Sequence, residues 1–405
     1  MIRNKMIVVV GLQPWDIEIG SNCKDVAMEF SKHNKVLYVN APMDRYTWLF
    51  RRRRPAVKRR LEIFRTKDNL VEVAPNIWNL YPQHVIKSIN WIPIHPLFDS
   101  FNKKNNERFA GDIQEAIVKL GFKDFILFND CDMLRGQYLM ELLKPALSLY
   151  YFRDHLMATP YWFRHGHVFE PQLMKKSTLV CANSLYLKKI AEKYNPNTFV
   201  VGSGVDLNLF DAAKKLKVPD DMAGIKGPII GYIGAIISNR LDLRLLIDLC
   251  RKRKDWSFVF IGKADHGFKS SELFKLPNVH FLGWRPESTL PGYLQCFDVA
   301  MNPQAVNEMT IGNYPRKIDE YLSMGKATVA TDTIFMRDTF VEYVYLGKTT
   351  ADYEELIALA LRENVEQPEL KERRIRFGRT HSWAAHIKSI SEAIEKVQPG
   401  WNDPD

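Results

Sequence analysis

The chain has 405 residues, of which 46% are hydrophobic and 26% charged, and its net charge at neutral pH is +10. This length exceeds what one hydrophobic core usually fills, so we expect two domains, and the apolar content argues against a disordered chain. The five cysteines are far apart and form no C-x-x-C pair, which argues against a disulfide framework and favours a cytoplasmic location. We expect neither a signal sequence nor a membrane-spanning segment, because no apolar run is long enough.

The first half of the chain alternates short apolar runs with helical patterns. Runs rich in Val, Ile, Leu and Phe predict strands that are covered on both faces, as in a parallel sheet flanked by helices. The segment 78–102 is rich in Pro and aromatic residues and predicts an irregular loop-and-helix insertion at one edge. A first helix is expected over 21–33, and strands are expected at 6–11, 35–40, 125–129, 147–152, 178–183 and 198–201.

A second alternating series follows a break near residues 205–225. We therefore predict two doubly wound, Rossmann-like α/β domains, 1–205 and 206–380, with a last helix and tail over 381–405 that packs back toward the first domain. Ligands of such sheets bind beyond the carboxyl ends of the strands, which indicates a cleft where the two domains face each other. The second series has expected strands at 229–234, 257–262, 279–282, 297–302, 327–331 and 343–346.

A basic cluster lies just after a group of apolar and aromatic residues. The surface of an anionic membrane suits this mixture, so we expect peripheral contact through Trp48–Arg60. A solvated, mobile loop is the alternative, and nucleic acid is not expected because no nucleic-acid-binding module is recognisable. The residues are Tyr46, Trp48, Leu49 and Phe50, followed by Arg51, Arg52, Arg53, Arg54, Lys58, Arg59 and Arg60.

The segment 313–331, N-Y-P-R-K-I-D-E-Y-L-S-M-G-K-A-T-V-A-T, predicts a short helix that runs into a buried strand. Pro315 suits the first helical turn, and Gly325 suits a left-handed cap at the end of the helix. Lys317, Glu320 and Tyr321 are three and four residues apart and share one face. A cation, a carboxylate and an aromatic ring near a helix N-terminus could hold a nucleotide, whereas the alternative is an exposed Lys/Glu pair without a ligand.

Two other loops in the second half follow strand ends. Arg240 could neutralise a diphosphate, because its guanidinium matches two phosphate oxygens; the alternative is a salt bridge with Asp242. Gly312, close to Thr310, is small enough to let backbone N–H groups reach a phosphate.

Two loops in the first half also follow strand ends. Gly20 would allow a ligand to approach the backbone at a helix start that Ser21 or Asn22 could cap. Asp154 and His155, next to Arg153, offer a general base and an anion clamp, although Asp154 could instead cap the helix that follows.

Two further patterns are weak signals for a metal. His165 and His167 are expected to be surface or loop histidines, and Asp130 and Asp132 to be loop carboxylates. We therefore predict no metal site.

Together these positions resemble the GT-B glycosyltransferases, in particular the large retaining, family 4-like group of teichuronic-acid and cell-surface polysaccharide type. The segment V-G-S-G-V-D-L-N-L-F at 201–210 is similar to the family's N-G-V-D-x-x-x-F stretch. F-L-G-W at 281–284 resembles its F-x-G turn, and P-R-K-I-D-E-Y-L-S-M-G-K at 315–326 resembles its P-x-K-x-x-E-Y-L-A-x-G-K-P motif. The likeness covers nearly the whole chain in order.

This resemblance implies transfer of a sugar from a nucleoside diphosphate donor, UDP by default, to a saccharide or lipid-linked acceptor. Glu320 would hold the ribose hydroxyls, Arg240 and Lys317 the diphosphate, and backbone near Gly312 the phosphates. Asp154 or His155 would serve the acceptor side. The resemblance also implies retention of configuration, no metal and no permanently bound cofactor.

The chain departs from the family pattern at two positions. Gly312 replaces a second glutamate, and Ala235 replaces an arginine after the first strand of the second domain. Two alternatives therefore remain open: a GT-B-fold epimerase that acts on the nucleotide sugar, and a non-catalytic homologue that binds it.

Overall fold

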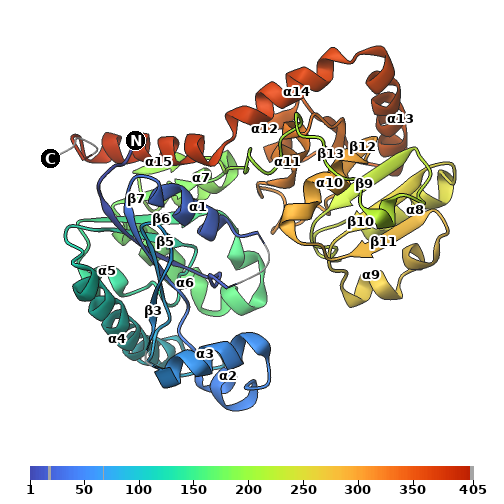
Figure 1. Ribbon diagram of the computed structural model, residues 1–405. Helices are drawn as coiled ribbons and strands as arrows, with labels where there is room; N and C mark the ends of the chain where they lie inside the picture. The colour runs from blue at the N-terminus through green and yellow to red at the C-terminus, as the bar shows by residue number, and fades with distance from the viewer. Residues whose placement is uncertain (17–19, 67, 402–405) are drawn as a thin grey trace. The chain divides into compact units, whose positions relative to one another are not determined.

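The computed structural model describes residues 1–16, 20–66 and 68–401, and of Ala56 only the backbone. The chain forms two compact units (Figure 1). The N-terminal unit comprises Met1–Gly202 together with the chain from His386, and the C-terminal unit comprises Ser203–Ala385.

The N-terminal unit is built on an eight-stranded sheet of order β3-β4-β2-β1-β5-β6-β7-β8. All neighbouring pairs are parallel except β3 and β4, which are antiparallel. Chain order reverses between β1 and β5, and ligands of such sheets bind at this switch point. The strands are β1 (Met6–Gly11), β2 (Lys35–Val39), β3 (Leu70–Ala74), β4 (Ile77–Leu80), β5 (Ile126–Asp130), β6 (Leu147–Phe152), β7 (Leu179–Ala182) and β8 (Thr198–Val200).

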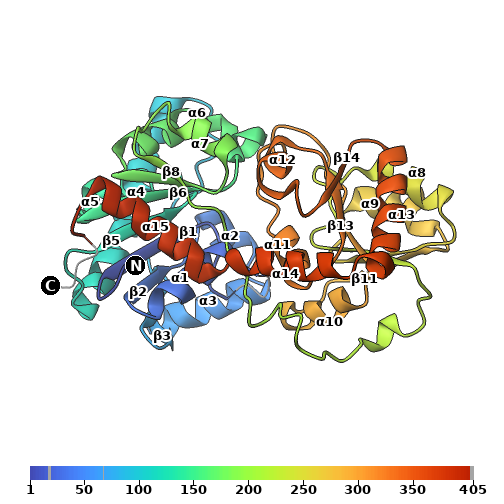
Figure 2. The same ribbon diagram turned by 90° about the horizontal axis from the view of Figure 1, so that it is seen from above.

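Helices cover this sheet. β1, β2 and β5 share a buried core with α4 and α5, and β6 and β7 share another with α6 and α7. Helix α15 runs along the unit, where the Ile2 N–H donates to Ser391 Oγ at 2.9 Å (Figure 2). The helices are α1 (Asn22–Ser31), α2 (Arg45–Phe50), α3 (Pro55–Thr66), α4 (His95–Leu120), α5 (Leu139–Leu143), α6 (Pro160–Lys176), α7 (Leu185–Ala191) and α15 (Trp383–Val397), with a 3₁₀ turn η1 (Leu156–Ala158).

The C-terminal unit contains a six-stranded, entirely parallel sheet of order β11-β10-β9-β12-β13-β14. Counted within the unit this is the order 3-2-1-4-5-6 of dinucleotide-binding folds, with the switch point between β9 and β12. This topology confirms the predicted pair of doubly wound α/β domains. The strands are β9 (Ile229–Ile233), β10 (Ser257–Ile261), β11 (Val279–Gly283), β12 (Val299–Asn302), β13 (Thr328–Thr331) and β14 (Tyr345–Gly347).

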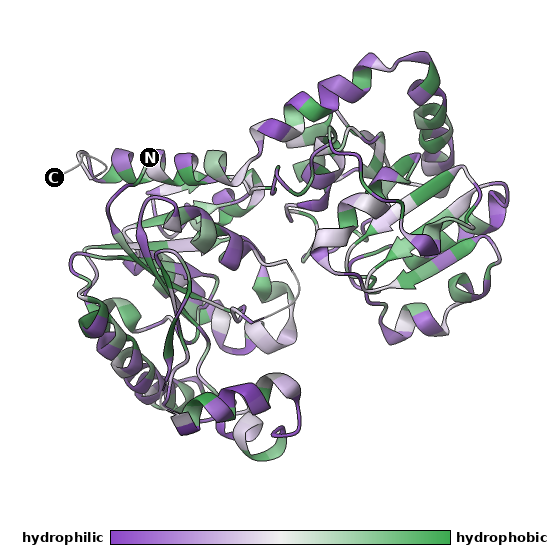
Figure 3. Cartoon of the chain, in the orientation of Figure 1, coloured by the Kyte–Doolittle hydropathy of each residue, from purple (hydrophilic) through white to green (hydrophobic). Residues whose placement is uncertain are grey.

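Two cores cover the faces of this second sheet. α10, α11 and α12 pack on one face, and α8, α9 and α13 on the other. In both units the hydrophobic residues gather on the strands and polar residues on the outer helices (Figure 3). The helices are α8 (Leu243–Lys252), α9 (His266–Ser270), α10 (Leu290–Gln295), α11 (Lys317–Ser323), α12 (Ile334–Phe340), α13 (Thr350–Glu366) and α14 (Glu369–Thr380), and the 3₁₀ turns are η2 (Asp220–Met222), η3 (Glu272–Lys275) and η4 (Glu287–Thr289).

One local prediction was only partly right. The segment 78–102, expected to be a loop-and-helix insertion, contains a loop and the first turns of the long helix α4, but it begins with strand β4, which pairs between β3 and β2. Lys58, Arg59 and Arg60 of the basic cluster lie in α3, and Arg51–Arg54 lie in the turn between α2 and α3. Helix α3 packs through the buried Val57 and through Arg60, whose side chain donates to the Ala41 carbonyl at 3.0 Å. Burial of this inner side fixes the helix and leaves the other basic residues exposed.

Candidate functional site

The switch point of the C-terminal unit is formed by the loops that follow β9 and β12. Gly234 directly follows β9 with φ of +146°, and Gly262 follows β10 with φ of +149°. A Cβ atom on Gly262 would lie 1.8 Å from the Gly234 carbonyl oxygen. Only glycine allows the two turns to approach this closely.

Helix α11 places a cation at this turn. Lys317 Nζ lies 3.0 Å from the Tyr232 hydroxyl, 4.8 Å from the centre of that ring, and 3.1 Å from where a Cβ on Gly234 would be. Four residues on, the Tyr321 hydroxyl accepts the Ile233 N–H at 2.9 Å. Lys317 and Tyr321 therefore both face the end of β9, as their helical spacing predicted.

Glu320 lies on the same helix beside Arg316. The two side chains form an ion pair of 3.3 Å, and the glutamate is 8% exposed. Burial raises the pKa of Glu320, and the charge of Arg316 acts in the opposite direction. The carboxylate is therefore partly desolvated and retains capacity to accept further hydrogen bonds.

The surroundings of α11 fix its position. The carboxylate of Asp319 accepts hydrogen bonds from the Tyr314 hydroxyl and from His381 Nδ1, each at 2.6 Å. Burial alone would lower the pKa of His381, but the hydrogen bond and charge of Asp319 raise it. The helix ends at Ser323, and Gly325 just beyond it has φ of +72°, which confirms the predicted left-handed cap. It begins at Lys317 rather than at Pro315, whose carbonyl accepts the Ile318 N–H just before the helix.

Lys326 follows the cap and has a structural task. Its ammonium donates to the carbonyls of Gln295 and Phe297, at 2.8 Å each. Burial lowers the pKa of Lys326 to about 8. This lysine of the motif therefore binds carbonyl groups at the end of α10 and does not lie at the switch point.

Arg240 lies in the loop between β9 and α8. Its side chain is exposed, and no ion pair of it is found within residues 1–16, 20–66 and 68–401. The alternative role as a partner of Asp242 is not seen there, because the Asp242 carboxylate caps α8 through the Leu245 N–H at 3.0 Å. The Ala305 N–H donates to the Arg240 carbonyl at 2.9 Å, so the loops after β9 and β12 are joined.

Gly312 is buried in the loop after β12. Thr310, two residues earlier, accepts the Asn307 N–H at 3.0 Å, and the Thr310 carbonyl accepts from Gln304 Nε2 at 2.7 Å. Ala235 is exposed, and its carbonyl accepts the Tyr232 hydroxyl at 3.1 Å. The structure thus brings Lys317, Ala235 and Tyr232 together at one turn.

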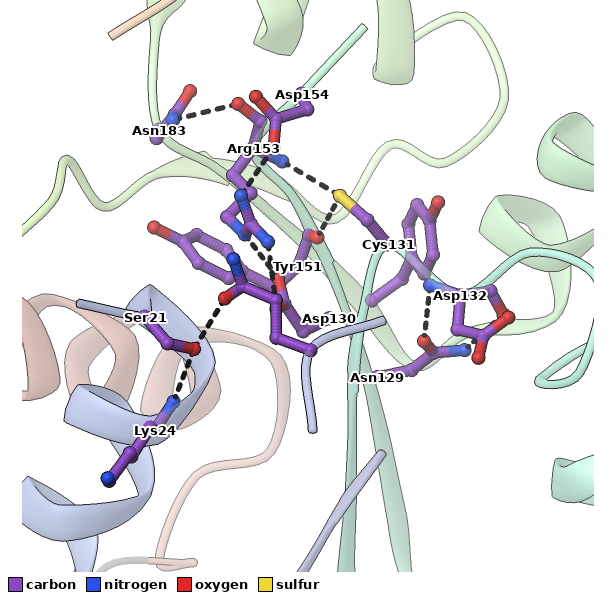
Figure 4. A network of polar contacts seen from close by, with 12 residues as sticks. Ser21, Lys24, Asn129, Asp130, Cys131, Asp132, Tyr151, Arg153, Asp154 and Asn183 are labelled. Carbon is purple, nitrogen blue, oxygen red and sulfur yellow. Dashed lines mark hydrogen bonds and ion pairs between the residues drawn. The ribbon is translucent and has the colours of Figure 1, made fainter. Parts of the chain in front are cut away.

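The switch point of the N-terminal unit holds a network of charges (Figure 4). Arg153, after β6, donates to both oxygens of the buried Asp130 at the end of β5, at 2.6 and 3.2 Å, and also forms an ion pair with Asp154. Burial alone would lower the pKa of Arg153, but these two carboxylates raise it. Asn183 fixes the Arg153 carbonyl at 3.0 Å. Asp154 pairs with the arginine, so its side chain does not serve as a helix cap.

The loop after β1 contributes to the same edge. Ser21 is the N-cap of α1, as predicted, and its hydroxyl donates to the Gln13 side chain at 2.5 Å. Gly20 directly precedes this cap, while Ile17–Ile19 of the predicted loop lie outside the described residues. A Cβ on Gly11 would lie 2.7 Å from Cys23 Sγ and 3.2 Å from Asp130 Cβ. Burial, with the nearby charge of Asp130, raises the pKa of the Cys23 thiol.

Sequence reasoning missed the role of Asp130. Its signal was available, because a carboxylate at the carboxyl end of a fully buried strand needs a partner. His155 is partly exposed at the start of η1. Asp132 forms an ion pair with Arg135 at 2.6 Å, so Asp130 and Asp132 each have a separate arginine partner.

The expectation for the two histidines near Gly166 was wrong for His165. Both histidines lie in α6, and His165 is 1% exposed while His167 is exposed. The His165 ring stacks on Phe98 at 3.6 Å, and its Nε2 lies 2.9 Å from the Ile92 carbonyl. The helical period of α6 turns one histidine inward and the other outward.

Two kinds of feature are absent from residues 1–16, 20–66 and 68–401. No cluster of three or more His, Cys, Asp or Glu side chains there is arranged to hold a metal ion. No helix in that part of the chain has the length and apolar content needed to cross a bilayer.

Comparisons with known proteins agree with this architecture. Residues 227–360 match the family "Glycosyl transferases group 1". A Bacillus subtilis protein described as a candidate teichuronic acid biosynthesis glycosyltransferase, TuaH, is 26% identical over 230 residues. That match covers 55% of this chain and 57% of the relative, so it spans little more than half of either protein.

Solved structures match over nearly the full length. Sucrose-phosphate synthase from Thermosynechococcus elongatus has a TM-score of 0.68 at 13% identity, over 97% of this chain and 99% of that one. The Anabaena protein HepE, in complex with UDP, has a TM-score of 0.64 at 14% identity, over 97% and 100%. At such identities the likeness shows the fold alone. Residues 227–360 therefore match the group 1 glycosyltransferases in sequence, and the chain as a whole has the fold of the solved GT-B structures.

Proposed function

We propose that this chain transfers a sugar from a nucleoside diphosphate, UDP by default, to a saccharide or lipid-linked acceptor of the cell envelope. The observation that carries the proposal is the Lys317 ammonium beside Gly234 at the end of β9, within the region that matches the family. HepE was solved with UDP and with UDP-glucose, and the Bacillus relative is named for teichuronic acid biosynthesis, which supports this choice of donor and acceptor class.

On the donor side, Lys317 and Arg240 would neutralise the diphosphate, with backbone near Gly312 contacting its oxygens. Glu320 would accept hydrogen bonds from the ribose hydroxyls. As the sugar leaves, negative charge develops on the departing diphosphate, and preplaced cations stabilise that charge most when water is excluded. The cations would thus bind the anionic phosphates, and the carboxylate would bind the hydroxyl donors of the ribose.

On the acceptor side, Asp154 and His155 would orient an acceptor hydroxyl or accept its proton. Asp154 is held by Arg153, and its side chain remains 27% exposed, so it can reach a ligand at this edge. Gly20 would let an acceptor approach the backbone. Retention of configuration and independence of metal follow from the family resemblance and belong to the same proposal.

The position of Lys317 bears on the rival of a non-catalytic homologue. Ala235 stands where the family usually has an arginine, which favours that rival. Lys317 of α11, however, lies at the adjacent Gly234 turn. Its ammonium therefore supplies a positive charge close to the position where the family's arginine is replaced by Ala235. Product analysis separates the remaining rivals, because an epimerase releases an altered nucleotide sugar without any acceptor.

Calorimetric titration of the chain with UDP and GDP tests the donor site. We expect micromolar binding of UDP, weakened about 5- to 150-fold by Lys317→Met or Glu320→Gln, the size of one lost charge-assisted hydrogen bond. Lys269→Met, which removes an exposed lysine on α9, is the matched control and should leave the affinity unchanged. Absence of any nucleotide binding at millimolar concentration would rule the proposal out.

A further inference from the structure

Three surface segments of the N-terminal unit carry exposed aromatic side chains that the proposed transferase reaction does not use. Of the eight exposed Phe, Tyr and Trp side chains in the described part of the chain, six lie in these segments. Phe50 is 72% exposed and Trp91 71%. Exposed apolar side chains are rarely so concentrated on a soluble protein, and where they are, they usually mark a surface that binds a partner or a membrane. The six are Tyr46, Trp48 and Phe50 in α2, Trp91 before α4, and Tyr161 and Phe163 in the first turn of α6.

Hydrogen bonds join the first segment to the second. The Ser88 hydroxyl donates to the Asp44 carboxylate at 2.5 Å and accepts the Tyr46 N–H at 3.0 Å. The Arg45 N–H donates to the Ile86 carbonyl at 2.9 Å. The start of α2 is therefore fixed against residues 86–88.

The second segment is joined to α6 in the same way. Asn90 Nδ2 donates to the Tyr161 carbonyl at 3.2 Å, and an Arg164 guanidinium N–H donates to the Asn90 carbonyl at 2.9 Å. His165 Nε2 lies 2.9 Å from the Ile92 carbonyl, which requires a proton on that nitrogen. The three segments are thus held to one another by hydrogen bonds. We call their exposed side the aromatic surface, and with the exposed aliphatic residues it comprises Tyr46, Trp48, Leu49, Phe50, Trp91, Ile94, Leu97, Tyr161 and Phe163.

Basic side chains adjoin the aromatic surface. None of the exposed basic residues of the cluster forms an ion pair within the described residues. Helix α2, which precedes them, has no buried side chain. Arg51 lies 5.3 Å from the centre of the Tyr46 ring and Arg52 lies 4.7 Å from that of Trp48, so charge and apolar surface are interleaved. The unpaired basic residues are Arg51, Arg52, Arg53, Arg54, Lys58 and Arg59.

We propose that the aromatic surface and its basic residues bind the face of an anionic phospholipid bilayer. Trp and Tyr favour the headgroup level, where the basic side chains meet lipid phosphates. A nucleic acid would satisfy the charges but would leave Leu49, Ile94 and Leu97 in water, so the aliphatic residues favour lipid. This membrane surface goes beyond the transferase reaction and does not depend on it.

Flotation of the full chain with vesicles tests the electrostatic part. The chain should bind vesicles of phosphatidylglycerol and phosphatidylcholine in 0.1 M salt and bind pure phosphatidylcholine far more weakly. A variant with Arg51→Gln, Arg52→Gln, Arg53→Gln and Arg54→Gln should bind at least about 100-fold more weakly, since each basic residue near such a surface contributes about fivefold. The control variant loses the same charge from exposed positions of α4 and the loop after it, and its binding should change little. It carries Lys103→Gln, Lys104→Gln, Lys119→Gln and Lys123→Gln.

Two single substitutions test the apolar part. Phe50→Ser and Trp91→Ser lie on different segments, and each should weaken vesicle binding about tenfold, whereas Val118→Ser, at another exposed apolar position, should not. Circular dichroism melts confirm that the variants are folded. The proposal is overturned if the wild-type chain fails to bind anionic vesicles, or if only the arginine variant loses binding. It is also overturned if RNA binds the chain and anionic vesicles do not displace it.

Discussion

The two switch points of this molecule use their cations in opposite ways. In the C-terminal unit, Lys317 contacts the Tyr232 hydroxyl rather than a carboxylate, and Arg240 is exposed. In the N-terminal unit, Arg153 is shared between Asp130 and Asp154. Since an anion binds where positive charge is not yet neutralised, the first edge suits a phosphate-bearing ligand. The second edge is already neutralised and suits an uncharged polar ligand such as a sugar hydroxyl.

The difference is also one of burial. Asp130 is fully buried, so its pairing with Arg153 must be kept for the unit to fold. The C-terminal cations are closer to water and contribute little to stability by themselves. Substitutions that remove a cation from each edge should therefore separate stability from ligand binding.

The largest effect is expected from Arg153→Met. It leaves the Asp130 carboxylate buried without its bidentate partner, and loss of one partner of a buried pair costs about 3–5 kcal/mol. Urea unfolding of the two proteins measures the difference.

Asp130→Asn in the Arg153→Met background is the control. The double variant should regain part of the lost stability, because the uncompensated charge is gone. A double variant as unstable as the sum of the two single variants would show that the pair is not coupled.

A pH-dependent loss of stability is expected from His386 of α15. Its Nδ1 lies 3.0 Å from the Val201 carbonyl, and burial lowers the pKa of His386 from 6.5 to about 4. The folded state therefore binds fewer protons than the unfolded state between these values. Stability is fully present above pH 6.5 and falls as the pH is lowered toward 4, by up to about 3 kcal/mol. Urea unfolding at pH 7.5 and 5 should show this slope in the wild type and a smaller one in His386→Gln.

Much of the architecture could be predicted because the strands are buried on both faces and are continuously apolar. The exposed helix α3 was missed, although Val57, Leu61 and Phe64 follow a helical spacing, because arginines dominate its sequence. The antiparallel edge strand β3 was missed as well. The turn after β3 is short, with Asn76 at φ of +63°. The side chains of β3 are only partly buried, so its sequence lacks the continuous apolar run that marks the other strands.

The candidate sites were predictable only in part. The shared face of Lys317 and Tyr321 follows from helical spacing, but their common target at the end of β9 depends on how α11 packs. The pairing of Asp130 with Arg153 depends on the register of β5 and β6, in which Asp130 lies opposite Tyr151. No local pattern encodes that register. The roles assigned to Asp154, His155, Gly20, Arg240, Gly312, Lys317 and Glu320 stay predictions, as does the cleft between the units.

A smaller loss of stability is expected from Gly234→Ala. A Cβ at φ of +146° would lie 2.9 Å from both Lys317 Cε and the Tyr232 hydroxyl. The strained backbone should cost about 1–3 kcal/mol, and displacement of the lysine should weaken UDP binding as well. Gly224→Ala is the control, because a Cβ there meets no atom within 4 Å. Equal unfolding midpoints for the two variants would contradict the close approach at the β9 turn.

The smallest change in stability, and the sharpest test of the comparison, is expected from Arg240→Gln. The side chain is exposed, so unfolding free energy should change by no more than about 0.5 kcal/mol. UDP affinity should nevertheless fall by about 1–3 kcal/mol if this guanidinium contacts the diphosphate. Arg251→Gln, which removes an exposed arginine from α8, should alter neither quantity by more than about 0.5 kcal/mol. Arg153→Met should lower the free energy of unfolding strongly, whereas Arg240→Gln should leave it nearly unchanged and weaken UDP binding. Comparison of the two variants therefore separates a cation that stabilises the fold from a cation that binds the ligand. An Arg240→Gln protein with unchanged UDP affinity would remove this arginine from the donor site and leave Lys317 as its cation.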